Sequence, residues 1–425
     1  MKHNPDIYLL YEYMKKIAYT VRIKVTLREP VDSTMLNQAA QEAIRRFPYF
    51  AVSPGLDEGE NIVLRPNANP IAVLPEENAR LVLGSDKVGG HLFAITWRDR
   101  SIWFNFSHSV CGAFGAMFWV KCTLYQYLTR KYGAIKAPGD LKAADSPVDP
   151  EEYAYPEADK LPTDEPLSRY TGGNSKVGLL GPFLRYLLNP FVKNNYYYEI
   201  EIPSREFMEV ARRLDASPNS LVTAMLLRAA GEHFPPKKGE HISCKIADDY
   251  RADVGCPRAY RDFVRFIHVK YDWTQGQETV EKLNMRARGA ILVQKAPELS
   301  YEVFRTAAKA HKGIDAQPDL KAKKKYAAAH STFRTDVRDT CTVSYVGQTD
   351  WGGMADYIDS VYTITDGNLV VEINALPDKF CLSFQMMLSG DRGALDVFCR
   401  ILKEYGLPFT LTEQMPRYLP DIRLP

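Results

Sequence analysis

One stretch decides the fold: SIWFNFSHSVCGAFGAMFWVKCTLYQYLTRKYG, residues 101–133. Its first part is the second arm of a predicted hairpin, which starts with the strand at 92–97 and turns at Arg98-Asp99-Arg100. Its second part has the spacing of apolar residues that is typical of a helix, from about Ala113 to Tyr132. His108 therefore lies in the connection between a strand and a helix, a usual position for a side chain that faces a cleft.

His108 is the strongest of the eight histidines as a candidate catalytic base. Gly112 and Gly115 follow it, and such small residues let a substrate approach the backbone closely. Imidazole suits proton transfer because its unperturbed pKa lies near physiological pH. From spacing alone, a histidine at a strand end with satisfied hydrogen bonds is an equally good interpretation, and both stay open at this point.

The order of elements is similar in the two halves of the chain. Residues 18–26 alternate apolar and polar side chains, as a half-buried strand does, and a helix follows that ends at Pro48. Residues 194–203 form a comparable strand, and helices follow it as well. The strand–helix order of 18–48 thus resembles that of 194–234. This pattern predicts two related α/β lobes with a groove between them, a common site for ligands.

The length of 425 residues predicts two or three folded units. Residues 137–175 are rich in Pro, Asp, Glu, Ser and Gly and have no periodic apolar face, which is typical of a crossover between lobes. We place an N-terminal lobe at 1–160, a linker at 161–193 and a C-terminal lobe at 194–425. The predicted fold class is α/β, with each lobe an α+β two-layer sandwich and the two lobes forming a V.

The composition excludes several classes of function. Lys plus Arg number 54 against 52 for Asp plus Glu, so no electrostatic feature favours a nucleic acid as partner. No stretch approaches the ~20 apolar residues that span a bilayer. The seven cysteines are scattered without a C-x-x-C pair, which favours a reduced, cytoplasmic protein. Neither a metal-ligand pattern nor a phosphate-binding glycine loop occurs.

Four short motifs, in order, resemble those of one superfamily. Ser107 to Ala113 is similar to HHxxxDG with its second histidine retained, and the segment that ends at Arg251, CKIADDYR, is similar to a VNLR-type motif. Val343 to Gly347 resembles a late strand followed by a Ser/Thr–Asn–Gly turn. Asp350 to Gly353 resembles a DFGWG motif. The family is that of chloramphenicol acetyltransferase-like enzymes, which includes peptide-synthetase condensation domains and alcohol acetyltransferases.

The resemblance implies a role for each matching residue. His108 and Ser344 would be catalytic, His108 as general base and Ser344 as a donor to the oxyanion. Substrate binding would involve Ser107, Gly112 and Gly347, and structural support would come from Arg251 and Asp350. Ser344 is equally well interpreted as a strand serine bonded to backbone, and Asp350 as a residue that fixes a turn. Cys111 beside His108 is a competing nucleophile.

Two departures from the motif are important. Its aspartate is replaced by Gly112 and its glycine by Ala113. In the family this aspartate pairs with an arginine and holds the loop that carries the histidine. Here His108 would need another orienting group, for example a backbone carbonyl or the hydroxyl of Ser107 or Ser109. The arginine without its expected partner would be Arg22 or Arg251, and the substitute carboxylate would come from Asp248, Asp249 or Asp350.

The resemblance therefore implies an acyltransferase that moves an acyl group from a thioester to a hydroxyl or amine. The donor would be acyl-CoA or a phosphopantetheine thioester as co-substrate, with no tightly bound cofactor and no metal. An acyl carrier protein is a partner in the second case. The alternative is a catalytically degenerate, condensation-like binding or scaffold protein, which the loss of the motif aspartate at Gly112 favours. A hydrolase that uses the same base on water is a third interpretation.

Overall fold

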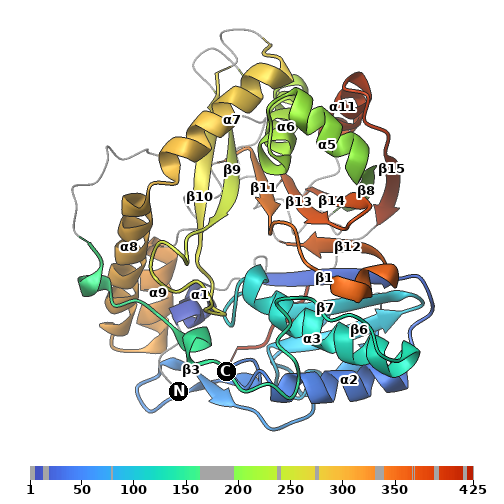
Figure 1. The fold of residues 1–425 in the computed structure, drawn as a ribbon. Coiled ribbons are helices and arrows are strands. Elements are labelled where there is room, and N and C mark those ends of the chain that lie inside the picture. Colours follow the sequence, from blue (N-terminus) through green and yellow to red (C-terminus); the bar gives the residue numbers. More distant parts are fainter. Residues whose placement is uncertain are drawn as a thin grey trace.

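The computed structural model describes residues 5–12, 19–77, 80–162, 196–236, 241–272, 277–330, 339–365, 367, 369–386, 392–414 and 419–424. Two β-sheets, each with helices packed against one face, form most of the fold (Figure 1). Each sheet and its helices have a separate hydrophobic core of buried side chains.

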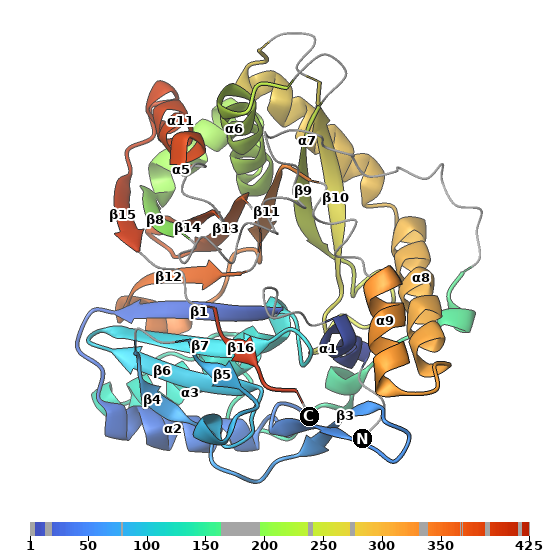
Figure 2. The ribbon, with the colours of Figure 1, turned by 180° about the vertical axis from the view of Figure 1, so that it is seen from behind.

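The first sheet has five strands in the order β12-β1-β7-β6-β4. Its strands are β1 (Thr20–Leu27), β4 (Val73–Pro75), β6 (Phe93–Arg98), β7 (Ser101–Ser107) and β12 (Ile358–Ile364). Helices α2 (Ser33–Arg45) and α3 (Ala113–Tyr132) lie on one face of it (Figures 1 and 2). The buried ring of Trp119 on α3 packs edge-on against Phe104 of β7, with 5.2 Å between centroids, and so fixes strand against helix.

The second sheet has seven strands in the order β10-β9-β11-β13-β14-β8-β15. They are β8 (Tyr196–Pro203), β9 (Ile242–Asp249), β10 (Val264–Tyr271), β11 (Cys341–Tyr345), β13 (Leu369–Ala375), β14 (Lys379–Met386) and β15 (Thr410–Gln414). The helices of this lobe are α5 (Ser204–Arg213), α6 (Pro218–His233), α7 (Val280–Gln294) and α11 (Arg392–Glu404). Strands β9 and β10 reach from this lobe toward the first one (Figure 1).

The C-terminal part of the chain contributes strands to the first lobe. β12 pairs antiparallel with β1, with Arg22 opposite Ile364, and β16 (Asp421–Ile422) pairs with β5 (Val82–Leu83). Lys24 of β1 also forms an ion pair of 2.6 Å with Glu199 of β8, and both side chains are nearly buried. The lobes are therefore joined by backbone pairing as well as by side chains. The linker predicted at 161–193 lies almost wholly outside the described residues, and the lobe boundaries remain predictions.

A smaller group of elements lies beside both sheets. The two-stranded sheet of β2 (Val52–Leu56) and β3 (Ile62–Pro66) belongs to it, with η1 (Pro5–Tyr8), α1 (Leu9–Glu12), α8 (Pro297–Asp315) and α9 (Leu320–His330). Besides η1, the described residues include the 3-10 helices η2 (Asp86–Val88), η3 (Pro150–Tyr153), η4 (Ala158–Lys160) and η6 (Gly352–Asp356).

Local sequence signals explain several of these boundaries. Asp32 caps α2 by accepting a hydrogen bond of 2.9 Å from the backbone N–H of Met35. Ser217 and Ser220 form a reciprocal capping box at the start of α6. The predicted hairpin and the following helix are present as β6, β7 and α3. None of the helices in the described part of the chain is long and apolar enough to cross a membrane.

Candidate active site

His108 occupies the short turn between β7 and α3. Its backbone N–H donates a hydrogen bond of 2.7 Å to the carbonyl of Tyr19, which precedes β1, so the turn is tied to the neighbouring strand. Phe106 packs edge-on against the imidazole, with 6.1 Å between centroids. The side chain is 26% exposed, while its Nδ1 atom is buried. The exposed part of the ring is therefore the side away from Nδ1, so Nε2 is the nitrogen that a substrate can reach.

The buried Nδ1 atom of His108 faces a carboxylate from the other lobe. Oδ2 of Asp262, in the connection between β9 and β10, lies 3.5 Å from Nδ1, which is slightly longer than a hydrogen bond. Burial raises the pKa of Asp262, while His108 and Arg251 favour its charged form. Hydrogen bonds in unliganded active sites are commonly long and shorten when the substrate binds. The pair has the arrangement of a base and an orienting acid.

Gly112 creates the space that Asp262 fills. A Cβ atom at residue 112 would lie 2.7 Å from Oδ1 of Asp262, closer than two such atoms can approach. The space beside Gly112 is thus occupied by a protein side chain rather than left open for a substrate. The family motif places its aspartate at this same position. In this chain, a carboxylate that is distant in sequence lies there instead.

Ser107 and Ser109 support the turn from within. Their hydroxyl oxygens are 2.7 Å apart, the backbone N–H of Ser109 donates to Ser107 Oγ at 3.2 Å, and both residues are fully buried. These two hydroxyls therefore bond to each other. Of the orienting groups considered from the sequence, neither serine faces Nδ1 as Asp262 does.

Arg251 pairs with Asp249, one of the carboxylates expected as its partner. Its Nε donates to Asp249 at 2.9 Å, a terminal nitrogen donates to the carbonyl of Ala259 at 3.0 Å, and the guanidinium lies 3.7 Å from the ring centroid of Phe114. The buried guanidinium thus holds the β9–β10 connection against the first turn of α3.

Arg22 and Asp248, which the sequence also suggested for this arginine–carboxylate pair, have other partners. Arg22 donates to Asn105 at 2.8 Å and to Glu76 at 2.7 Å, and Asp248 pairs with Arg265 at 3.1 Å. Arg22 also lines a cavity of about 290 Å³, whose wall includes Pro420 near the C-terminus. His108 does not line this cavity, so we locate the candidate site from the chemistry around His108 instead.

Ser344 and Gly347 lie on or after β11 in the second sheet. Ser344 is opposite Glu372 of β13 and hydrogen-bonds to its carboxyl group, while Thr365 donates to the same group at 3.2 Å. Burial raises the pKa of Glu372 to about 7. Gly347 has a φ of +92°, and no atom lies within 4 Å of the position of a Cβ there, so this turn is open.

Asp350 fixes a turn near the N-terminal lobe. Its carboxylate accepts from the backbone N–H groups of Gly139 at 2.7 Å and Gly352 at 2.9 Å, and these bonds lower its pKa. Gly352 has a φ of +52° and packs directly on the backbone of Lys136, where a Cβ would lie 2.7 Å from the carbonyl oxygen. Asp350 thus connects the segment after α3 to η6.

The environment of Cys111 does not favour a nucleophile. The thiol is fully buried, and burial raises its pKa well above the ordinary value. A thiolate is the reactive form, so this cysteine is held in the unreactive state. Within the described ranges, no three side chains of His, Cys, Asp or Glu converge as a metal site.

Comparisons with known proteins bear on the fold. By sequence, no protein-family model and no curated protein matches the chain. Among solved structures, polyketide synthase associated protein 5 from Mycobacterium tuberculosis is 10% identical, with a TM-score of 0.55 over 96% of this chain and 98% of that one. TRI101 from F. sporotrichioides, complexed with coenzyme A and T-2, is 9% identical, with a TM-score of 0.59 over 94% and 97% of the two chains.

A condensation domain also matches. That of the monacolin K polyketide synthase MokA is 12% identical, with a TM-score of 0.52 over 94% of this chain and 96% of that one. These matches confirm the prediction of a two-lobed α/β fold. The chain has the fold shared by chloramphenicol acetyltransferase-like enzymes and condensation domains.

Proposed function

We propose that the protein is an acyltransferase that uses His108 as general base. The observation that carries the proposal is the position of His108: it directly follows β7, its Nδ1 is buried against a carboxylate, and its side chain is partly exposed. An imidazole held in this way presents Nε2 to an incoming hydroxyl or amine. The donor is a thioester, either acyl-CoA or an acyl group on a pantetheine arm.

We propose the following reaction. Nε2 of His108 removes the proton of the acceptor as its oxygen or nitrogen attacks the thioester carbonyl, which gives a tetrahedral oxyanion. Backbone N–H groups stabilise the oxyanion, or the hydroxyl of Ser344 does so once it leaves its hydrogen bond with Glu372. The carbon–sulfur bond then breaks, the acyl group stays on the acceptor, and the imidazolium returns the proton to the departing thiolate. No resident cofactor takes part.

The fold supports this donor class. TRI101 of the same fold was solved with coenzyme A and the small molecule T-2, and we propose a CoA or pantetheine thioester and a small-molecule acceptor for this chain too. A carrier protein is the partner if the donor is bound to a pantetheine arm. We further propose a cytoplasmic location, because the seven scattered cysteines favour a reducing compartment.

The scaffold interpretation loses part of its basis. It rests on Gly112 in place of the motif aspartate, and Asp262 supplies a carboxylate at that position. The test is thiol release from acyl-CoA and acyl-pantetheine donors, with hydroxyl and amine acceptors. Release that depends on the acceptor supports a transferase, and release without an acceptor supports a hydrolase. Release from neither donor class supports the scaffold.

A further inference from the structure

We infer that Asp262 is the positioning residue of His108, and that the segment 258–262 of the C-terminal lobe is therefore part of the active site. The inference rests on the proposed function, because it concerns the base of that reaction. It assigns to a residue in the second lobe the position that the family motif gives to an aspartate four residues after the histidine.

The start of α3 has no side chain at the two positions that contact the 258–262 segment. Both glycines near His108 are contact points for this segment: a Cβ at residue 112 would collide with the Asp262 carboxylate, and a Cβ at residue 115 would lie 1.9 Å from the carbonyl oxygen of Tyr260. A glycine at each position lets the segment lie directly on the helix backbone. The two small residues after His108 therefore accommodate protein rather than substrate.

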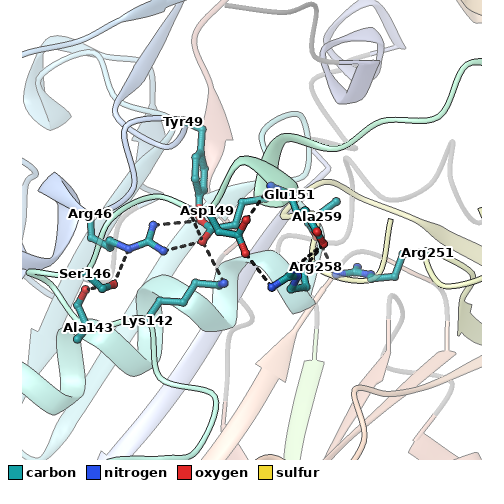
Figure 3. A network of polar contacts seen from close by, with 11 residues as sticks. Arg46, Tyr49, Lys142, Ala143, Ser146, Asp149, Glu151, Arg251, Arg258 and Ala259 are labelled. Atoms are coloured by element: carbon teal, nitrogen blue, oxygen red, sulfur yellow. Dashed lines mark hydrogen bonds and ion pairs between the residues drawn. The ribbon is translucent and has the colours of Figure 1, made fainter. Parts of the chain in front are cut away.

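The 258–262 segment is fixed by several contacts with the N-terminal lobe. The Tyr260 backbone N–H donates to the carbonyl of Glu152 at 3.1 Å, and the Tyr260 ring stacks on Tyr49 with centroids 4.0 Å apart. Arg258 forms ion pairs with Asp149 at 2.9 Å and Glu151 at 2.6 Å (Figure 3). The 3-10 helix η3 and its N-cap residue thus hold the segment in place as well.

The helix η3 is in turn fixed to the core of the N-terminal lobe. The buried carboxylate of Glu152 accepts two bonds from Arg46, at 2.5 and 3.1 Å, and one from Tyr49, at 2.5 Å. Lys142 adds an ion pair of 3.1 Å (Figure 3). A fully satisfied buried carboxylate of this kind fixes one geometry. A continuous series of contacts therefore runs from the N-terminal core through η3 and Tyr260 to Asp262.

Charged groups of both signs surround Asp262. Its carboxylate is faced by His108 and Arg251, which favour its ionised form, and by Asp249 and Asp6, which oppose it. Its backbone N–H donates to Asp6 at 3.1 Å, and its Oδ1 accepts from the N–H of Val264 at 3.2 Å. With Oδ1 held by Val264, Oδ2 remains for Nδ1 of His108.

The role of this pair follows from its geometry. A carboxylate next to Nδ1 favours the tautomer that carries its proton there, so Nε2 is left free to accept the proton of the acceptor. It also stabilises the imidazolium that forms during the reaction. Because His108 and Asp262 come from different lobes, the base is complete only when the β9–β10 connection is docked on α3.

A four-member cycle tests the inference: wild type, Asp262→Gly, Gly112→Asp and the double variant. We expect each single change to lower kcat by about 10- to 100-fold with little effect on KM. Asp262→Gly removes the carboxylate, and Gly112→Asp directs a second one against Asp262. The double variant moves the carboxylate to its position in the family motif, and we expect its kcat within about threefold of wild type.

Two further readouts separate positioning from folding. Asp262→Asn keeps the shape and removes the charge, and Asp253→Asn, on the same connection with a similarly exposed carboxylate, is the matched control. We expect only the first to lower kcat. The ¹⁵N signals of the His108 ring, which need no turnover, should show the proton on Nδ1 in wild type and its redistribution in Asp262→Asn.

The outcomes distinguish this inference from the proposed function. If Asp262→Asn keeps the wild-type kcat and ring tautomer, or if the double variant is no more active than Asp262→Gly, the inference is wrong and the transferase stands. If the wild type transfers no acyl group, the proposed function fails. The ring signals then still decide whether Asp262 sets the tautomer of His108.

Discussion

The carboxylate of Asp262 fills the space that a side chain at residue 112 would occupy, since a Cβ there would lie 2.7 Å from its Oδ1. Gly112 and Asp262 are thus complementary: the residue lost from the motif and the residue that replaces it are in contact. In this chain, a carboxylate distant in sequence thus lies beside the glycine that follows His108 by four residues. The lobes then share the candidate site, because one supplies the histidine and the other its partner.

Substitution of Gly115 tests the docking of the 258–262 segment. In Gly115→Ala the new methyl group would lie 1.9 Å from the carbonyl oxygen of Tyr260, so the segment must move away from α3. We expect a loss of stability of about 1–3 kcal/mol and a lower kcat. Urea unfolding and the thiol-release assay measure the two effects.

The control is a second helical glycine without neighbours. Gly289 in α7 has no atom within 4 Å of its Cβ position, so Gly289→Ala should stabilise the protein by up to about 1 kcal/mol through helix propensity. If Gly115→Ala behaves in the same way, the close packing on α3 is not required.

The buried carboxylate of Glu152 should contribute strongly to stability. In Glu152→Gln the guanidinium of Arg46, which is 3% exposed, loses its charged partner inside the protein. We expect the free energy of unfolding to fall by about 3–5 kcal/mol, as when one member of a buried ion pair is removed. Glu77→Gln, which removes a surface partner of Lys87, should change it by less than about 1 kcal/mol. If both variants lowered the free energy of unfolding equally, burial of the Arg46–Glu152 pair would be unimportant for stability.

The raised pKa of Glu372 implies that the stability of the protein depends on pH. Burial raises its pKa from the ordinary 4.5 to about 7, so between these values the folded state holds a proton that the unfolded state releases. The free energy of unfolding should therefore decrease by about 3 kcal/mol as the pH rises from 4.5 to 7, and this term should be constant outside that window. Unfolding of wild type and Glu372→Gln at several pH values measures it. An unchanged slope in the variant would contradict the assignment.

Cys111 should be dispensable for chemistry. Because burial raises the pKa of its thiol, a covalent acyl-cysteine intermediate is not expected. We expect Cys111→Ala to keep kcat within about threefold of wild type. Mass spectrometry of the protein during turnover should show no acyl adduct, and an adduct on Cys111 would establish the competing mechanism.

The parts of the fold that follow local rules were predictable from the sequence. The strand before His108, the helix after it and the cap at Asp32 depend on periodicity and on residues a few positions apart. Asp262 was not predictable in this way. It is one of four aspartates between 248 and 262, and no local pattern distinguishes the one that reaches His108.

Pairing between distant strands was equally beyond local patterns. β12 follows β11 in the chain but joins β1 in the other sheet, where Ile364 lies opposite Arg22. The apolar and polar alternation of β12 and its burial suit either sheet. Only the assembled structure shows which sheet β12 joins. The glycines after His108 did carry a signal of close approach. The sequence suggests a substrate as the approaching group, whereas the structure places Asp262 and Tyr260 there.

The most direct test of the account compares thiol release by wild type and His108→Ala, with acyl-CoA and acyl-pantetheine donors and hydroxyl or amine acceptors. Loss of a general base should lower acceptor-dependent release by at least ~10²-fold. His330→Ala, which changes an exposed histidine on α9, is the control and should release thiol at the wild-type rate. Equal release by wild type and His108→Ala would contradict the assignment of His108 as the base.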